Sequence, residues 1–306
     1  MSETSSSSAR PAIRRVACIG TGTIGSGWAA LGLARGLDVA AWDPAPGAEA
    51  ALAASIDGAW PKLARLGLTD GASRERLVFA PSLADAVAGA DFVQESAPDD
   101  EALKIGLLAE IDSACPRAAV IASSSSRFLP TRLASSCRHP ERVIVGHPFV
   151  PAYLVPLVEV VGGERTLPGV MTAAAAFYTR LGKRPLLLKK EIEAYVANRL
   201  QHAVFEEALR LVAAGVCDYD DIDRAVTWGP GLRWAVVGPV LHRHLGGGKG
   251  GVRHMIEHFG WRGAPGTEQA FIDAVEARWG HVSIDALESW RDDNLIAMLE
   301  HLEPPP

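Results

Sequence analysis

The chain of 306 residues has little cysteine and no long apolar run. Its four cysteines are far apart and form no Cys-x-x-Cys spacing; they are Cys18, Cys115, Cys137 and Cys217. We therefore expect free thiols in a reducing compartment and no disulfide framework. The sequence contains no stretch of about twenty apolar residues, and its N-terminus has no apolar signal core. These absences predict a cytoplasmic protein without a membrane span.

The chain also lacks an excess of positive charge. Acidic residues number 36 and basic residues 30, which gives a net charge of −6 at pH 7. Nucleic acids and anionic membranes attract proteins through clustered Lys and Arg, so we expect neither as a partner. Apolar residues make up 48% and charged residues 22%. Such values are typical of a globular protein, and the length suits about two domains.

A glycine-rich turn near the start of the chain carries the clearest functional signal. A short apolar stretch leads into Gly20, Gly22 and Gly25, and a helix of small residues follows. Gly20 permits a tight turn, Gly22 lets a pyrophosphate approach the backbone, and Gly25 lets the helix pack against its strand. The first helical residues, Thr23 and Ile24, offer free N–H groups to the phosphates. This pattern predicts a dinucleotide site.

An acidic residue follows this turn at a suitable distance. The apolar run 39–42 ends at Asp43, eighteen positions after Gly25. A carboxylate there accepts hydrogen bonds from the diol of the adenosine ribose. No Arg lies in residues 44–48 to neutralise a 2′-phosphate, so we expect NAD rather than NADP. A tight strand-to-helix turn beside an exposed acid would look similar, but here the strand, turn, helix and acid all fit the pattern of a dinucleotide site.

The pattern along the chain predicts two domains. Apolar runs typical of buried strands lie at 16–19, 39–42, 77–79, 92–94, 119–122, 143–145, 154–161 and 185–188, with helices expected at 48–66, 101–115 and 170–181. This alternation predicts a mostly parallel sheet with helices on both faces, an α/β dinucleotide-binding domain of the Rossmann type at 14–190. Residues 1–13 read as a disordered polar tail.

Residues 191–303 have almost only helical periodicity. Helices are expected at 196–214, 220–227, 236–245, 252–259 and 284–302. They predict an all-α C-terminal domain for substrate binding and dimerisation. The first of these helices has one apolar stripe, formed by Val196, Leu200, Val204, Ala208 and Leu211. The stripe would pack either on the first domain or on a second subunit of a homodimer.

A histidine and a glutamate have the chemistry that alcohol oxidation needs. His147 follows an apolar run at the end of an expected strand, where open α/β sheets place their ligands, and Glu159 lies on the next run. An imidazole removes the hydroxyl proton while hydride leaves the carbon, and a carboxylate on its other nitrogen orients it. The alternative is a core histidine and a surface acid. An unpaired carboxylate inside a buried strand is unfavourable, which favours the catalytic pair.

Several further motifs occur in an order typical of one family. They are Gln94-Glu95-Ser96, the run Ser123–Ser126, Gly146-His147-Pro148-Phe149, Leu157-Val158-Glu159-Val160 and Ala197-Asn198-Arg199-Leu200. With the glycine turn and Asp43, they resemble the 3-hydroxyacyl-CoA dehydrogenase superfamily over residues 14–260. Within it, the segments Trp42–Ala50, Gln94–Pro98, Val160–Thr166, Gly231–Trp234 and Gly250–His254 most resemble the branch of carnitine dehydrogenases and lambda-crystallin, an L-gulonate dehydrogenase.

The resemblance implies a role for individual residues. It makes His147 the general base and Glu159 its orienting partner, with the Ser126 hydroxyl and the Asn198 amide near the substrate oxygen. Without it, Ser126 would be read as a loop residue and Asn198 as a helix-surface amide.

The resemblance also places Glu95 and Lys104 near the ribose and nicotinamide side of the cofactor. The alternative is that Lys104 lies on a solvated helix face, without a role in binding.

The chain departs from the family pattern at three places. Val150 stands where Asn is usual, Glu193-Ala194-Tyr195 replaces Pro-Gly-aromatic, and Arg127 follows Ser126 where a small residue is common. These differences bear on the substrate more than on the cofactor. Loss of the usual Asn removes a polar group beside His147, which would lower activity on the family's usual substrates.

The residues between Asp43 and the 77–79 run favour a small free acid over a thioester. Their only cations are scattered: Lys62, Arg65, Arg74 and Arg76. A coenzyme A thioester needs cations for its phosphates. We expect Arg127 or Arg233 to bind a substrate carboxylate, beside Phe149, Val150 and Trp234. Aromatic faces suit a quaternary ammonium such as that of carnitine, although core packing is the more common role for each candidate taken alone: Phe128, Phe149, Tyr153, Trp228 and Trp234.

The expected activity is NAD-dependent oxidation of a small 3-hydroxy acid to the 3-oxo acid, with carnitine favoured. A 3-hydroxyacyl-CoA or L-gulonate is the alternative substrate. A non-catalytic, crystallin-like protein is the alternative of another class, and a binding protein would need neither His147 nor Glu159. His254 and His258 share a helix face, but Met255 stands where the zincin pattern His-Glu-x-x-His has its glutamate, so we expect no metal.

Overall fold

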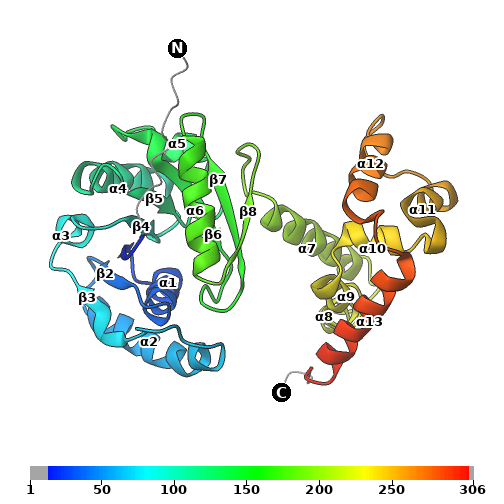
Figure 1. Cartoon of the computed structure of the whole chain (residues 1–306), viewed down its shortest axis with the longest axis horizontal. Coiled ribbons are helices and arrows are strands. Elements are labelled where there is room, and N and C mark those ends of the chain that lie inside the picture. The colour runs from blue at the N-terminus through cyan, green and yellow to red at the C-terminus, as the bar shows by residue number, and fades with distance from the viewer. Residues whose placement is uncertain (1–12, 303–306) are drawn as a thin grey trace, which may run out of the picture. The chain divides into compact units, whose positions relative to one another are not determined.

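The computed structural model describes residues 13–302 and shows a sheet covered by helices, followed by a helical unit (Figure 1). The predicted tail at 1–13 lies, except for Ile13, outside the described residues. The strands are β1 Arg15–Ile19, β2 Asp38–Trp42, β3 Leu77–Phe79, β4 Phe92–Glu95, β5 Val120–Ser123, β6 Val143–Pro148, β7 Leu157–Gly162 and β8 Arg184–Leu187. They form one eight-stranded sheet in the order β3-β2-β1-β4-β5-β6-β7-β8.

All neighbouring strands of this sheet run parallel except β6 and β7. The predicted Rossmann-type fold is thereby confirmed. The antiparallel pair arises because only a short loop joins β6 to β7, whereas a parallel pair needs a crossover connection. The helices of this unit are α1 Thr23–Ala34, α2 Ala48–Arg65, α3 Leu83–Val87, α4 Glu101–Ala114, α5 Pro130–Leu133 and α6 Pro168–Arg180, with short 3-10 turns at Arg74–Arg76 and Pro140–Arg142.

The sheet separates two apolar cores. On β1, Val16 and Cys18 face one core, which includes residues of α1, α2 and α6. Ala17 and Ile19 face the other, which includes residues of α3 and α4. Strands buried on both faces read as continuous apolar runs, which is why β1, β4 and β5 were visible in the sequence. Because both faces of the sheet are buried, the ends of the strands are held in place, and so are the loops that carry the site.

The second unit is helical, as predicted. The chain divides between His202 and Ala203, inside α7, whereas the sequence placed the boundary near residue 190. Its helices are α7 Ala197–Ala213, α8 Tyr219–Thr227, α9 Pro230–Val236, α10 Pro239–Leu245, α11 Gly251–Phe259, α12 Glu268–Trp279 and α13 Ile284–Leu299, with a 3-10 turn at Gly248–Gly250. The helix expected at 236–245 is present but begins only at Pro239, because proline lacks an N–H and clashes with a preceding helical turn.

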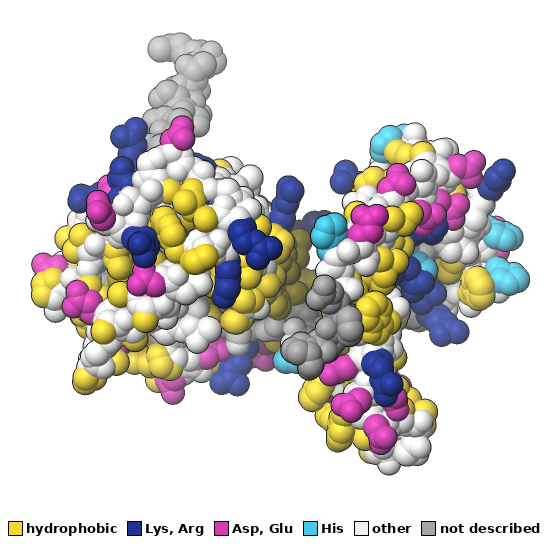
Figure 2. Space-filling model, turned by 90° about the horizontal axis from the view of Figure 1, so that it is seen from below, with side chains coloured by type: hydrophobic (Ala, Val, Ile, Leu, Met, Phe, Trp, Pro, Cys, Tyr) yellow, Lys and Arg dark blue, Asp and Glu magenta, His cyan; other side chains and the backbone are white. Residues whose placement is uncertain are grey.

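Two small cores hold the second unit together. One joins α11 to α12 through Val252, Ile256 and Val275. The other joins α10 to α13 through Leu241, Leu245 and Leu287. By contrast, α7, α8 and α9 contain no buried residue. None of the helices within residues 13–302 has the length and apolar character to cross a membrane. Apolar, acidic and basic side chains are interspersed over the face drawn in Figure 2.

Candidate active site

The predicted cofactor turn and His147 lie at the same edge of the sheet. Gly20 follows the end of β1, and Ser96 and Ser124 follow the ends of β4 and β5. His147 lies near the end of β6, which runs parallel to β5. Parallel strands therefore present all these residues at their carboxyl ends, where open α/β sheets bind ligands.

The glycine turn fits a pyrophosphate. Gly20 has φ +83°, and a Cβ there would lie 2.8 Å from backbone atoms of the segment after β4. A Cβ on Gly25 would lie 1.8 Å from the Gly20 carbonyl oxygen, whereas one on Gly22 would meet nothing within 4 Å. Helix α1 begins at Thr23, followed by Ile24, with no side-chain cap and no acidic residue in its first turn. Its N–H groups and dipole therefore face open space beside Gly22, where an anion binds favourably.

Asp43 is fixed beside this turn. Its Oδ2 accepts hydrogen bonds from the Thr21 backbone N–H at 2.7 Å and the Thr21 hydroxyl at 3.2 Å, and its Oδ1 accepts the Ala45 N–H at 2.9 Å. The side chain is half-buried, so part of the carboxylate stays accessible. A carboxylate held there suits a ribose diol and repels a 2′-phosphate.

His147 and Glu159 form a buried pair. They are register partners on β6 and β7, and the His147 Nδ1 lies 2.9 Å from the Glu159 Oε2. His147 is 5% exposed and Glu159 is fully buried, so the alternative of a surface acid is wrong. The carboxylate accepts a hydrogen bond from the Nδ1–H group, which leaves Nε2 with a free lone pair in the neutral imidazole.

Glu159 is also tied to the start of α7. Its Oε1 accepts the backbone N–H groups of Val196 and Ala197, each at 2.9 Å. Burial disfavours the charged carboxylate, but the hydrogen bonds from His147 and these two N–H groups outweigh it and lower the pKa of Glu159 below its ordinary value. Glu159 is therefore an anion at neutral pH and stabilises a positive charge on the imidazole.

The serine turn, residues 123–128, carries the predicted hydroxyl. The half-buried Ser126 donates from Oγ to the Asp99 carboxylate at 2.6 Å, and Ser125 donates to the other oxygen at 2.9 Å. Asn198 Nδ2 donates to the Ser126 carbonyl oxygen at 3.1 Å. The structure thus joins Ser126 and Asn198, although they belong to different elements. Asp99 was missed by sequence reasoning, because consecutive acids at the start of a helix are typical capping residues.

Two models of the 3-hydroxyacyl-CoA dehydrogenase family match consecutive parts of the chain. The NAD binding domain matches residues 15–192, and the C-terminal domain matches residues 195–281. The chain belongs to the 3-hydroxyacyl-CoA dehydrogenase family. It is an NAD-dependent oxidoreductase that acts on a 3-hydroxy substrate, as the sequence predicted.

Similar proteins match nearly the whole length of the chain. The chain is 50% identical to an L-carnitine dehydrogenase of Streptomyces griseus, over 94% of this chain and 89% of that one. It is 47% identical to an L-carnitine dehydrogenase of Pseudomonas putida, over 94% of both chains. Among solved structures, an NAD+-dependent 5-formyl-3-hydroxy-2-methylpyridine 4-carboxylic acid 5-dehydrogenase has 30% identity and a TM-score of 0.75, covering 95% of this chain and 100% of that one.

Glu95 and Lys104 form a second buried pair in this dehydrogenase. The Lys104 Nζ lies 2.8 Å from the Glu95 Oε1, and the same oxygen accepts the Ala97 N–H at 2.6 Å. Glu95 Oε2 also accepts the Ser123 hydroxyl at 2.5 Å. Lys104 is 1% exposed, so a solvated helix face is wrong for it. The pair holds the segment after β4 in place; contact of either residue with the cofactor stays a prediction.

The predicted substrate residues are only partly brought together. The Phe149 ring lies 4.9 Å from the His147 ring, and the neighbouring Val150 is exposed. The exposed Arg127 places its guanidinium 4.8 Å from the Phe128 ring, and Tyr153 faces Lys62. These two rings therefore already face cations of this chain. Arg233 and Trp234 lie on α9, in the second unit.

Proposed function

We propose that this dehydrogenase oxidises L-carnitine to 3-dehydrocarnitine, with His147 as the general base oriented by Glu159. The observation that carries the proposal is the buried hydrogen bond between these two side chains at the carboxyl edge of the sheet. The similarity to L-carnitine dehydrogenases, at 44% to 50% identity, supports the substrate.

The residues of the chain suit each part of this reaction. When bound, NAD supplies the acceptor for the hydride that leaves the C3 carbon. The His147 Nε2 takes the hydroxyl proton, so that the alcohol becomes a ketone and the imidazole becomes a cation. The Glu159 anion stabilises this cation and holds the tautomer with Nε2 free. General-base catalysis of this kind accelerates a reaction by roughly 10²–10⁴-fold. Ser126 and Asn198 would bind near the substrate oxygen.

A coenzyme A thioester is the second candidate substrate, because the family models are named for it. Both readings share the His147 chemistry and differ in the substrate's anionic groups. Arg127 or Arg233 would bind the carnitine carboxylate, and aromatic rings would face its quaternary ammonium. L-Gulonate is the third candidate. The buried pair argues against a non-catalytic protein, because a binding function gives no reason to hold an imidazole against a desolvated carboxylate.

The substrate is tested by following NADH formation at alkaline pH with L-carnitine, 3-hydroxybutyrate, L-gulonate and 3-hydroxybutyryl-CoA in parallel. We expect turnover of L-carnitine far above that of the other three. Turnover of the thioester alone would contradict the choice of a free acid. No turnover of any of them, with NADH still bound, would favour the non-catalytic alternative.

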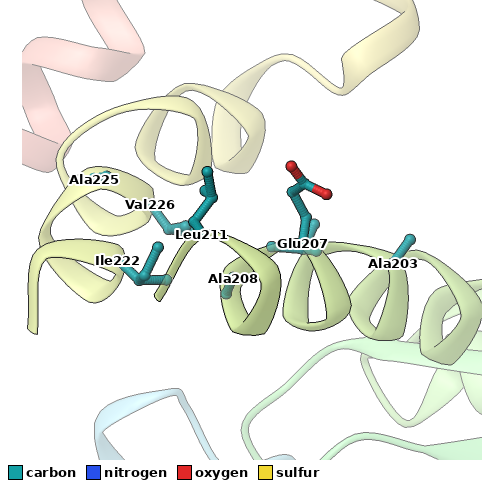
Figure 3. A pocket seen from close by; sticks show the side chains of 8 residues that line it. Ala203, Glu207, Ala208, Leu211, Ile222, Ala225 and Val226 are labelled. Carbon is teal, nitrogen blue, oxygen red and sulfur yellow. The ribbon is translucent and has the colours of Figure 1, made fainter. Parts of the chain in front are cut away.

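We also propose that the enzyme is a homodimer through α7 and α8, and that it works in the cytoplasm, where its four free cysteines stay reduced. Leu200 and Phe205 on α7 are each 60% exposed, which is unfavourable for a helix left in water. Between α7 and α8 lies an apolar hollow of about 380 Å³, with Leu211, Ile222 and Val226 grouped in it (Figure 3). A second copy related by a two-fold axis would cover this apolar surface of α7 and α8 on both chains.

The dimer is tested by the Phe205→Glu variant, with the matched control Val78→Glu at a strand residue that is 62% exposed. We expect the first variant to sediment as a monomer and the control to sediment like the wild type. A monomeric wild type would contradict the proposal.

A further inference from the structure

A short segment before and within the first turn of α7 contacts both parts of the proposed catalytic site. We call residues 194–198 the junction segment. Three of its hydrogen bonds reach the serine turn: Ala194 N–H to the Arg127 oxygen at 3.2 Å, Tyr195 hydroxyl to the Phe128 oxygen at 2.7 Å, and Asn198 Nδ2 to the Ser126 oxygen at 3.1 Å. In the same segment, the backbone N–H groups of Val196 and Ala197 donate to the Glu159 carboxylate. One stretch of backbone therefore sets the serine turn relative to the histidine–glutamate pair.

The side chain of Tyr195 contacts both His147 and the serine turn. It is fully buried. Its ring centroid lies 5.4 Å from that of His147, and Phe149 also packs against the imidazole. Two aromatic rings thus leave the imidazole little room to rotate, because buried side chains are packed as closely as in a crystal. The Tyr195 hydroxyl donates to the Phe128 oxygen in the serine turn.

The backbone of the junction segment is in an unfavourable conformation. Ala194 has φ 58° and Tyr195 has φ 51°, and both are residues with a Cβ in the left-handed region. Such a conformation is destabilising by about 1 kcal/mol per residue and persists where surrounding contacts hold it. Burial raises the pKa of Tyr195 well above its ordinary value, so the phenol stays protonated and acts only as a hydrogen-bond donor.

We propose that Tyr195 is a positioning residue for the reaction: its ring holds the imidazole and its hydroxyl holds the serine turn at a fixed distance from it. This rests on the proposed function of His147. The two contacts are separable by substitution. Tyr195→Phe keeps the ring and removes only the hydroxyl, whereas Tyr195→Leu removes the ring as well.

The experiment compares both variants with Tyr178→Phe, using NADH formation with L-carnitine and its C3-deuterated form. Tyr178 is a matched control, because it is also fully buried and donates its hydroxyl at 2.7 Å, but to Gln94 in the core. Each protein is checked for folding by thermal unfolding and for NADH binding by fluorescence.

We expect Tyr195→Phe to lower kcat/KM about tenfold, mainly through KM, because the Phe128 oxygen loses its donor and the serine turn shifts. Tyr195→Leu lowers kcat about a hundredfold, because a base misplaced by about 1 Å costs that much. It also raises the deuterium isotope effect on kcat, since hydride transfer becomes slower than product release. NADH binding stays unchanged in both, and Tyr178→Phe loses stability without either kinetic change.

Kinetic constants of both Tyr195 variants that match those of Tyr178→Phe would overturn the inference. If Tyr195→Leu fails to fold, an unchanged KM and kcat in Tyr195→Phe would by themselves overturn the inference. An inactive wild type on every 3-hydroxy acid would instead contradict the proposed function, so the two failures are distinguishable.

Discussion

The substitution Glu159→Gln keeps the shape of the side chain and reverses one hydrogen bond. The Glu159 Oε1 accepts two backbone N–H groups, so the single oxygen of a glutamine must stay there. Its amide NH2 then faces the His147 Nδ1, at the place where Oε2 now accepts at 2.9 Å. A donor at that place forces Nδ1 to accept and moves the proton to Nε2. The variant thus holds the tautomer that cannot remove a proton from the substrate.

The size of the effect follows from this tautomer argument. General-base catalysis is worth roughly 10²–10⁴-fold, and the equivalent change in a serine protease triad lowers kcat about 10⁴-fold. We therefore expect Glu159→Gln to lower kcat by about 10³-fold. NADH binding stays unchanged, because Asp43 and the glycine turn lie on other strands and loops of the sheet.

The assay is steady-state NADH formation with L-carnitine, with NADH fluorescence titration as the binding control. Glu164→Gln, an exposed glutamate that follows β7, is the matched control and should retain the wild-type kcat. A Glu159→Gln enzyme that keeps more than about a tenth of the wild-type kcat would refute the tautomer argument. Equal loss of NADH binding would show instead that Glu159 is only structural.

Three further predictions concern backbone strain, cofactor choice and pH. Ala194→Gly should raise the unfolding free energy in urea by about 0.5–1 kcal/mol, because φ 58° is unstrained for glycine; a loss of stability would contradict the strain. Asp43→Asn should raise KM for NAD and lower the preference for NAD over NADP, measured as a ratio of kcat/KM values; an unchanged ratio would remove Asp43 from the ribose site. Burial lowers the pKa of Lys183 to about 8 from 10.5. The unfolded chain therefore binds more protons between these values, and the part of the stability due to Lys183 should rise from about pH 8 to 10.5. Urea unfolding across that range, with Lys183→Met as the reference that lacks the trend, measures it, and an equal trend in both proteins would contradict the assignment.

The first unit was predictable because its signals are local. The glycine turn, the run ending at Asp43, and the apolar runs of β1 and β6 each lie within a few residues, and buried parallel strands read as continuous apolar stretches. His147 and Glu159 were identified from residue type and strand position. Their contact follows from the antiparallel register of β6 and β7, which a short loop between two strands favours.

The remaining features depend on contacts between distant residues. Lys104 looks like a surface lysine on a helix until Glu95, on a strand, pairs with it. Tyr195 has a left-handed backbone conformation. It is explained by the hydrogen bonds that neighbouring residues make to Glu159 and to the serine turn, which are distant in sequence. In the second unit, α12 was missed, because residues 268–279 have weak amphipathic periodicity and bury little besides Ile272 and Val275.

The most direct test of the account compares wild type with His147→Ala. The two measurements are NADH formation with L-carnitine and NADH binding by fluorescence, with His258→Ala, an exposed histidine of α11, as the control. The account predicts that His147→Ala loses turnover by at least about 10²-fold while its NADH affinity and the activity of His258→Ala match the wild type. A His147→Ala enzyme that oxidises L-carnitine at a rate near that of the wild type would contradict the central claim.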